Sequence, residues 1–521
     1  MGWIDCKIKK LYHSISLQEK GAFVSAAVFG FIAHGYMLVN RIPNHDNLHY
    51  AFDINHPVNS FYDMSRWALP SVCNFSGEWS IPWLIGLICI VMTGFSAAVV
   101  VKVLDIKSIF FAVLTGAMFA VFPSATGILT YMAMADGYFI AVFLSAAAAK
   151  LILSEKTGNI PAAVFCLTVS LGLYQAYLPI CLCIICLYMM KQYMRGIADV
   201  RYLFRKMIKT LMVCLSSILI YMEIAELCIA GNSRFHGQYG IPLEKIPEQI
   251  SFSLQNILGF FFFNRYGVSP LWMAVVSGCL LTAGIILFVW CMRQTRRRWQ
   301  DIAVIFCIGV SFLASTVFIY FMSYAADVHL LMIYSFVMWP VVIIMLADFA
   351  MEGFEKNLVT GRILPVVSAI CIMAMTWGYV ICANQTYLKM QLADSELYAY
   401  SVRLIERIEN CDGYKNDMPV VFIGKPSVQK DNESLSKILW GGVEEITGAL
   451  SPDAWFTAAT SYHSYQEYLQ QELGWDHIIY REYAHYGGHF ENLEEIQKGM
   501  TVYPQNGCMK IVDHVIFIRF E

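Results

Sequence analysis

The sequence predicts a mainly α-helical fold: a polytopic membrane bundle of about 11 transmembrane helices, followed by a small C-terminal α/β domain. Of the 521 residues, 58% are hydrophobic and 14% are charged, and the mean hydropathy is +0.54. These values exceed those of soluble domains, and the apolar runs recur near the length that crosses a bilayer. The composition becomes typical of a soluble protein from about residue 384. A net charge of −3 does not indicate a nucleic-acid partner.

Membrane helices are expected where apolar runs approach the ~20 residues needed to span hydrocarbon. The first run follows several lysines and has no small-residue cleavage site, which predicts a retained helix and no cleaved signal peptide. The expected spans are 21–39, 80–101, 108–125, 130–152, 160–174, 177–193, 208–229, 270–292, 302–322, 329–347 and 363–383.

Lysine and arginine alternate between the connections, and this asymmetry predicts the orientation. Positive residues gather in the connections near Lys102, Lys150, Arg201, Arg296 and Arg362, which share one side with the N-terminus. The positive-inside rule makes that side cytoplasmic, so an odd helix count puts the C-terminus outside. We therefore predict a transmembrane domain at 1–383 with external loops at 40–80 and 231–268, and an extracytoplasmic α/β domain at 384–521.

The C-terminal domain shows both helical and strand patterns. Helical spacing is expected over 390–410, 461–473 and 491–499, and buried strands over 418–423 and 511–520. Cys411 and Cys508 lie in this domain and could pair, whereas most other cysteines lie in apolar runs.

The loop 40–80 concentrates acids, histidines and arginines in a chain poor in charge. Asp46 follows the first helix within Pro-Asn-His-Asp-Asn, a turn-forming sequence that would hold a carboxylate at the membrane surface, where its pKa can be tuned for proton abstraction. The alternative is a helix N-cap. His45 and His49 have the i, i+4 spacing of metal ligands, but no further metal motif accompanies them, so loop histidines that donate hydrogen bonds are favoured.

Arg66 and Asp136 are two further candidates. An external guanidinium suits bidentate binding of a phosphate, although Arg66 could equally pair with Asp63. Asp136 lies at the outer start of the fourth helix, and an ionisable residue at membrane depth is a functional candidate unless it caps a helix or reaches the interface.

Other polar residues accompany the expected outer face. Tyr174 and Gln175 join two helices and could bind sugar hydroxyls or anchor the interface. Glu223 and Glu226 are weaker candidates, for which helix packing is the alternative. Arg234 in the second external loop, and Asp327 with His329 before the tenth helix, are further weak candidates.

Several nucleotide-binding motifs are absent from the sequence. There is no P-loop, no Gly-x-Gly-x-x-Gly and no Asp-x-Asp motif. A transferase acting outside the membrane would need an activated sugar delivered through the bilayer, and a polyprenyl-phosphate sugar meets that need.

Three short motifs occur in a fixed order. Ser-Arg-Trp-Ala spans 65–68, Ala-Asp-Gly-Tyr-Phe spans 135–139, and Gly-Leu-Tyr-Gln-Ala-Tyr spans 172–177. With the segment 383–394 and the closing strands, this order resembles the Gtr type-II glucosyltransferases over essentially the whole chain.

The resemblance implies a GT-C-type glycosyltransferase of the bacterial inner membrane. Such proteins transfer a sugar, typically from undecaprenyl-phosphate glucose, to a surface polysaccharide such as O-antigen. The family's first-loop acidic motif corresponds to Asp46, which implies a general base there; Asn47 stands where a second acid is common. A divalent cation is possible, and no metal ligands are assigned. A transporter or lipid-linked-sugar flippase, or a non-catalytic scaffold, are the alternative functions.

Overall fold

The chain folds predominantly into helices, and the expected fold class is confirmed. The structure is a computed structural model that describes residues 15–44, 47–48, 61–62, 64–77, 79–228, 241–294, 299–323, 328–353, 359–424, 459–480 and 493–520. Within these ranges ten helices are long and apolar enough to cross a membrane.

The chain divides into two compact units. The first unit comprises residues 1–40 and 55–384, and the second comprises residues 41–54 and 385–521. The second unit therefore takes one piece from the first loop of the sequence and the rest from its C-terminal quarter.

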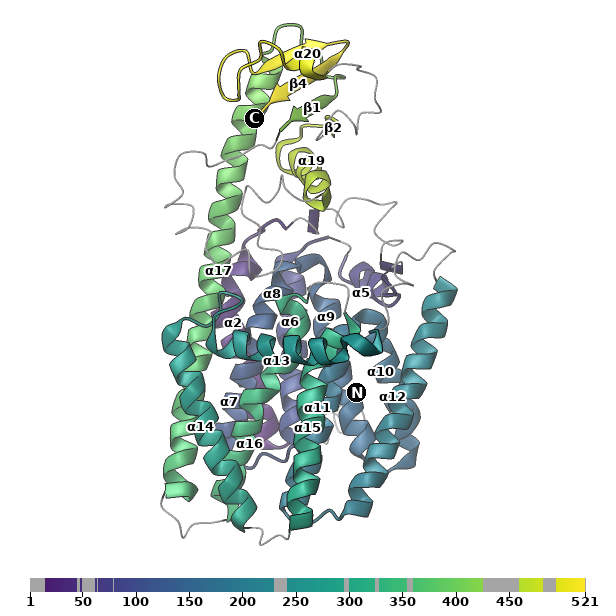
Figure 1. The fold of residues 1–521 in the computed structure, drawn as a ribbon, viewed down its shortest axis with the longest axis vertical. Helices are drawn as coiled ribbons and strands as arrows, with labels where there is room; N and C mark the ends of the chain where they lie inside the picture. The colour runs from purple at the N-terminus through teal and green to yellow at the C-terminus, as the bar shows by residue number, and fades with distance from the viewer. Residues whose placement is uncertain are drawn as a thin grey trace, which may run out of the picture. The chain divides into compact units, whose positions relative to one another are not determined.

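The first unit is a bundle in which most helices run along one direction (Figure 1). Ser16 caps α2 by accepting the backbone N–H of Glu19, which fixes where that helix begins. α2 packs closely on α7, because a Cβ at Gly116 would lie 2.1 Å from the Ala22 carbonyl oxygen. The helices are α2 (Leu17–Val39), α5 (Leu69–Phe75), α6 (Pro82–Val103), α7 (Ile109–Val121), α8 (Pro123–Thr130), α9 (Met132–Leu153), α10 (Ile160–Leu173), α11 (Leu178–Met194), α12 (Val200–Cys228), α13 (Ile246–Phe262), α14 (Leu271–Gln294), α15 (Trp299–Met322), α16 (Met338–Gly353) and α17 (Leu364–Glu409).

Four of the expected helices differ from those observed in continuity or length. The span expected at 108–125 breaks at Phe122, because Pro123 has no N–H to continue α7 and instead begins α8. The span expected at 160–174 is α10, whose 14 residues fall short of the length of the other spans. The helices expected at 363–383 and 390–410 form one continuous helix, α17, since no proline or glycine interrupts the residues between them.

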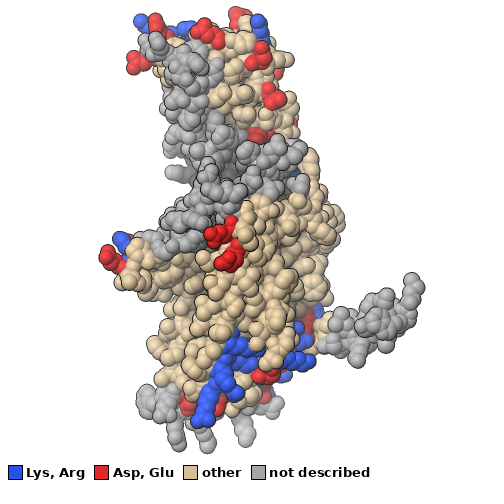
Figure 2. All heavy atoms as spheres, turned by 90° about the vertical axis from the view of Figure 1, so that its right-hand side faces the viewer, with Lys and Arg blue, Asp and Glu red and all other residues tan. Residues whose placement is uncertain are grey.

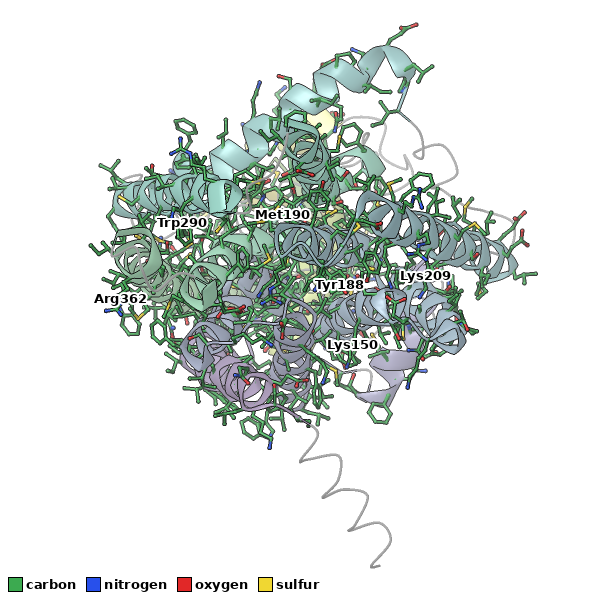
Figure 3. The ribbon with its side chains drawn as sticks, turned by 90° about the horizontal axis from the view of Figure 1, so that it is seen from below. Lys150, Tyr188, Met190, Lys209, Trp290 and Arg362 are labelled. Carbon is green, nitrogen blue, oxygen red and sulfur yellow. The ribbon has the colours of Figure 1, made fainter. Side chains whose placement is uncertain are left out.

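Basic side chains gather at one end of the bundle, which we call the basic end (Figure 2). Figure 3 views this end and labels Lys150, Lys209 and Arg362 there. The opposite end, which we call the Arg66 end, carries Arg66 and the turn η2 (Gln175–Tyr177). This asymmetry has the form of the positive-inside rule.

The second unit contains a four-stranded sheet with the order β2-β1-β4-β3. β1 (Val420–Ile423) pairs in parallel with β2 (Ile479–Tyr480) and β4 (Val515–Arg519), while β3 (Met509–Val512) pairs antiparallel with β4. The strand expected at 511–520 is thus a hairpin, because Asp513 and His514 adopt positive φ of 45° and 68° and reverse the chain.

Two helices accompany this sheet. They are α19 (Ala459–Leu473) and the short α20 (Leu493–Gln497). One core cluster joins residues of α17, α19 and the sheet, including Leu404, Tyr465 and Ile518. Cys411 and Cys508 are both free thiols, so the disulfide considered from the sequence does not form.

Candidate active site

Arg66 lies in a group of aromatic side chains at the Arg66 end of the first unit. Its Nη1 donates to the Tyr138 hydroxyl across 3.0 Å, and its Cζ lies 4.4 Å from the centroid of the Tyr174 ring. The Tyr138 and Tyr174 rings stack with centroids 4.6 Å apart. A guanidinium held over a ring and a hydroxyl is oriented before any ligand arrives. We call Arg66, Tyr138, Tyr174 and Gln175 the Arg66 cluster.

The backbone around Arg66 explains this placement. The Ala68 N–H donates to the Gly172 carbonyl across 3.0 Å, which ties the segment to the end of α10. A Cβ at Gly172 would lie 2.4 Å from the Trp67 ring, so glycine permits the close approach. The motifs around Arg66 and Tyr174, more than 100 residues apart in the sequence, are therefore neighbours in the fold.

Gln175 completes the cluster. Its Nε2 donates to the Tyr221 hydroxyl across 2.6 Å and reaches the carbonyls of Met64 and Ser65 across 3.3 and 3.4 Å. Gln175 thus joins α12 to the segment that carries Arg66. Its amide is engaged by protein groups, which favours a positioning role for Gln175 over direct contact with sugar hydroxyls.

Asp136 is fully buried, with 0% exposure, but it lies on another face of α9. Asp136 and Tyr138 are two positions apart in the sequence, which turns their side chains about 200° apart around the helix. One carboxylate oxygen, Oδ1, accepts the Gly137 N–H across 2.8 Å, and Oδ2 has no hydrogen-bond partner among the described residues. Ser76 and Cys89 are its electrostatic neighbours, so the structure does not bring Asp136 into the Arg66 cluster.

The remaining predicted residues divide into two groups. His329 is exposed at the start of η4 (Leu330–Val337), and Glu223 and Glu226 are exposed on α12. Other candidates lie outside the described residues: His45, Asp46, His49, Asp53, Asp63, Arg234 and Asp327. Within the part of the chain that is described, no group of three His, Cys, Asp or Glu side chains could hold a metal ion.

The described residues that flank Asp46 in the sequence are anchored within the second unit. Asn44 and Asn47 are 1% and 3% exposed, and Leu48 belongs to the core cluster with Leu397. The Leu48 carbonyl accepts the Gln471 Nε2 across 3.1 Å, and the Arg41 guanidinium lies 2.9 Å from the Glu472 carboxylate. The start of the first loop is therefore held by α19.

Replacing Leu48 by alanine tests this anchor. We expect the free energy of unfolding of the second unit to fall by about 2–5 kcal/mol, as for the truncation of other buried leucines. Amide hydrogen exchange in α19 should accelerate. Leu392→Ala, an exposed leucine of α17, is the matched control. Unchanged hydrogen exchange in α19 of Leu48→Ala would contradict the anchoring role of Leu48.

Sequence reasoning missed Tyr138 and Tyr221 as members of the site. Tyr138 lies within the motif that drew attention to Asp136, yet the acid was selected because a buried charge is unusual in a membrane helix. The helical period could have shown that the two residues belong to different sites, because it places residues 136 and 138 on different faces of the helix. Tyr221 carried no signal in the sequence.

The fold and the cluster define a class: a polytopic membrane protein with a pre-oriented arginine at one end of its helical bundle. The family model for glucosyl transferase GtrII matches residues 35–346, more than half of the chain, and the chain belongs to this family. It is therefore a membrane glycosyltransferase. No match is found among curated proteins or solved structures. The matched region includes Asp46, the Arg66 cluster, Asp136, Arg234 and His329.

Proposed function

We propose that this glycosyltransferase moves a sugar, glucose by its family, from a polyprenyl-phosphate carrier to a surface polysaccharide. The reaction would take place on the outer face of a bacterial inner membrane, with the basic end of the bundle in the cytoplasm. The observation that carries the proposal is the Arg66 cluster: a guanidinium at the Arg66 end of the bundle, oriented by Tyr138 and Tyr174, suits the phosphate of a lipid-linked donor.

In the proposed reaction an acceptor hydroxyl attacks the anomeric carbon of the donor sugar. Its proton passes to the carboxylate of Asp46 as the new C–O bond forms. The bond between the anomeric carbon and the phosphate oxygen breaks, and polyprenyl phosphate leaves from the opposite face, so the configuration inverts. Arg66 stabilises the charge that develops on the leaving phosphate. Arg234 and His329 are the secondary candidates for that role.

Gln175 and Asp136 have roles separate from that of Arg66 in this proposal. Gln175 supports Arg66 through its hydrogen bonds to Met64, Ser65 and Tyr221. Asp136 would act on the same end of the unit through α5, since its neighbour Ser76 follows that helix. Neither residue needs to touch the donor for the reaction to proceed.

Purified protein incubated with polyprenyl-phosphate glucose and a polysaccharide acceptor tests the function. We expect release of the lipid phosphate, dependent on acceptor, with the β or α configuration of the donor inverted in the product. Movement of the lipid-linked sugar from one leaflet of vesicles to the other without transfer would instead identify a flippase and overturn the proposal.

Arg66→Ala tests the phosphate role. We expect the KM for the donor to rise about ten- to a hundredfold, in line with ~1.5–3 kcal/mol for a hydrogen bond to a charged group. Arg66→Lys should recover part of this loss, because lysine keeps the charge without the planar fork. Arg265→Ala, an exposed arginine after α13, is the control. An unchanged donor KM and turnover in Arg66→Ala would make Arg66 structural.

A further inference from the structure

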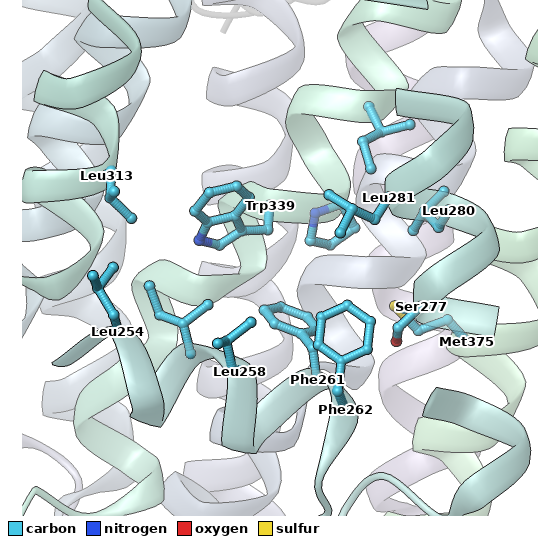
Figure 4. Close-up of a pocket in the computed structure, with 13 residues that line it drawn as sticks. Leu254, Leu258, Phe261, Phe262, Ser277, Leu280, Leu281, Leu313, Trp339 and Met375 are labelled. Carbon is cyan, nitrogen blue, oxygen red and sulfur yellow. The ribbon is translucent and has the colours of Figure 1, made fainter. Parts of the chain in front are cut away.

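A second feature of the first unit is an apolar cavity of about 340 Å³. Figure 4 shows Trp339 on one side of it and Leu258, Phe261 and Phe262 on the other. Five helices contribute its walls, α13 to α17. The lining is leucine, isoleucine and aromatic side chains with Pro340, Met375 and a single hydroxyl from Ser277.

The helix α13 is amphipathic and separates this cavity from a polar layer. It runs across the direction of the neighbouring helices (Figure 1). Leu254, Leu258 and Phe261 lie on its cavity face. On the opposite face Gln249 donates to the Tyr320 carbonyl across 2.6 Å, and the Tyr266 hydroxyl donates to Asn256 across 3.4 Å. The cavity is therefore on the hydrocarbon side of α13.

Positions along the helices give the depth of the cavity. Ser277 lies six residues into α14, about 9 Å from its start at a rise of ~1.5 Å per residue. Leu313 lies nine residues before the end of α15, about 14 Å from that end. Half of the hydrocarbon core is ~15 Å thick, so the cavity lies within the leaflet on the Arg66 side.

We propose that this cavity holds the polyprenyl chain of the donor. The proposal rests on the proposed function, which supplies a donor with an isoprenoid chain. The cavity faces hydrocarbon, so its occupant is apolar, and two features favour an isoprenoid over a saturated acyl chain. The Trp339 Nε1–H has no hydrogen-bond partner among the described residues, and an isoprene double bond offers it π density. The rings of Phe261 and Phe262 also suit packing against methyl-branched alkenes.

Filling the cavity tests the assignment. In Ser277→Trp the indole would occupy the space of the chain, whereas Val275→Trp places the same ring at a position that is 60% exposed and outside the lining. We expect Ser277→Trp to raise the KM of a long-chain polyprenyl-phosphate sugar by at least about tenfold, as for the loss of a few buried methylenes. Its KM for a dimethylallyl-phosphate sugar, whose one isoprene unit does not reach this depth, should stay within about twofold of wild type. Val275→Trp should change neither value.

A second readout does not depend on transfer. A diazirine-bearing polyprenyl phosphate without sugar is photolysed with the purified protein, and labelled peptides are mapped by mass spectrometry. We expect labels on α13 and α14 next to the cavity, lost in Ser277→Trp, kept in Val275→Trp and displaced by unlabelled polyprenyl phosphate. Trp339→Phe should weaken competition by the polyprenyl compound relative to its fully hydrogenated analogue.

The outcomes separate the two proposals. Labelling of the cavity without any sugar transfer would support the chain site and count against the proposed donor chemistry. Transfer that proceeds equally in Ser277→Trp and Val275→Trp, with labels elsewhere, would overturn the chain site and leave the proposed function intact. Displacement by phospholipid as effectively as by polyprenyl phosphate would assign the cavity to bulk lipid and overturn the proposal.

Discussion

Asp46→Asn is expected to lower the turnover number by about a hundred- to ten-thousandfold, the range that a positioned general base contributes. The amide keeps the size of the side chain and cannot accept the proton of the acceptor hydroxyl. Because the flanking residues Asn44 and Leu48 are buried in the second unit, the substitution should leave the fold and the donor KM unchanged. Release of lipid phosphate under saturating donor and acceptor measures the effect.

Asn47→Asp is the companion variant. It places an acid next to position 46, and it tests whether a neighbouring carboxylate can replace Asp46. Activity that returns in the double variant Asp46→Asn, Asn47→Asp would support a general base in this segment. Wild-type turnover in Asp46→Asn alone would remove the base from the scheme, and loss of α19 protection in that variant would show a structural role.

Asp348→Ala is expected to destabilise the first unit by about 3–5 kcal/mol, the cost of removing one partner of a buried ion pair. The Lys191 Nζ lies 3.5 Å from Asp348 Oδ2, and the two side chains are 2% and 1% exposed. The same carboxylate accepts the N–H groups of Lys107 and Ser108 across 3.0 and 2.8 Å, at the start of α7. The alanine variant would leave a buried ammonium and two backbone donors without this partner.

A more exposed charge of the same network provides the control variant. Arg195 bridges Asp105 and Glu352 at the half-buried edge of the same network. Burial alone would raise the pKa of Asp105, but Lys107 and Arg195 beside it hold that pKa below its usual value. Glu352→Gln, which is 26% exposed, should cost no more than about 1 kcal/mol. Thermal unfolding in detergent, followed by near-UV circular dichroism, measures each variant. A loss below about 1 kcal/mol in Asp348→Ala would show that the network is dispensable.

Much of the membrane bundle was predictable because hydrophobic length is a strong signal. The break at Pro123 and the continuity of α17 show where that signal ends. Hydropathy detects an apolar run, but it does not show that a proline within the run lacks a backbone N–H and breaks the helix. A polar stretch such as 384–390 is interpreted as a loop from its composition, although it contains no residue that interrupts a helix.

The candidate site was predictable to a lesser degree. Arg66, Tyr174 and Gln175 were named from separate motifs, and the fold brings them together. Tyr138 and Tyr221 were not, because a tyrosine in a membrane helix has no feature that separates packing from ligand contact. The cavity lined by helices α13 to α17 could not be predicted from the sequence either. Its walls come from five helices, and no local sequence pattern encodes their crossing angles.

The discontinuous second unit has a consequence for biosynthesis. Arg41 and Leu48 emerge from the ribosome near the beginning of translation, whereas α19, which contacts them, emerges near its end. Throughout the insertion of the intervening helices, these two residues have no completed partner. We therefore expect the nascent protein to be inactive until its final strands are made, and a chain truncated before residue 459 to insert in the membrane without becoming an enzyme.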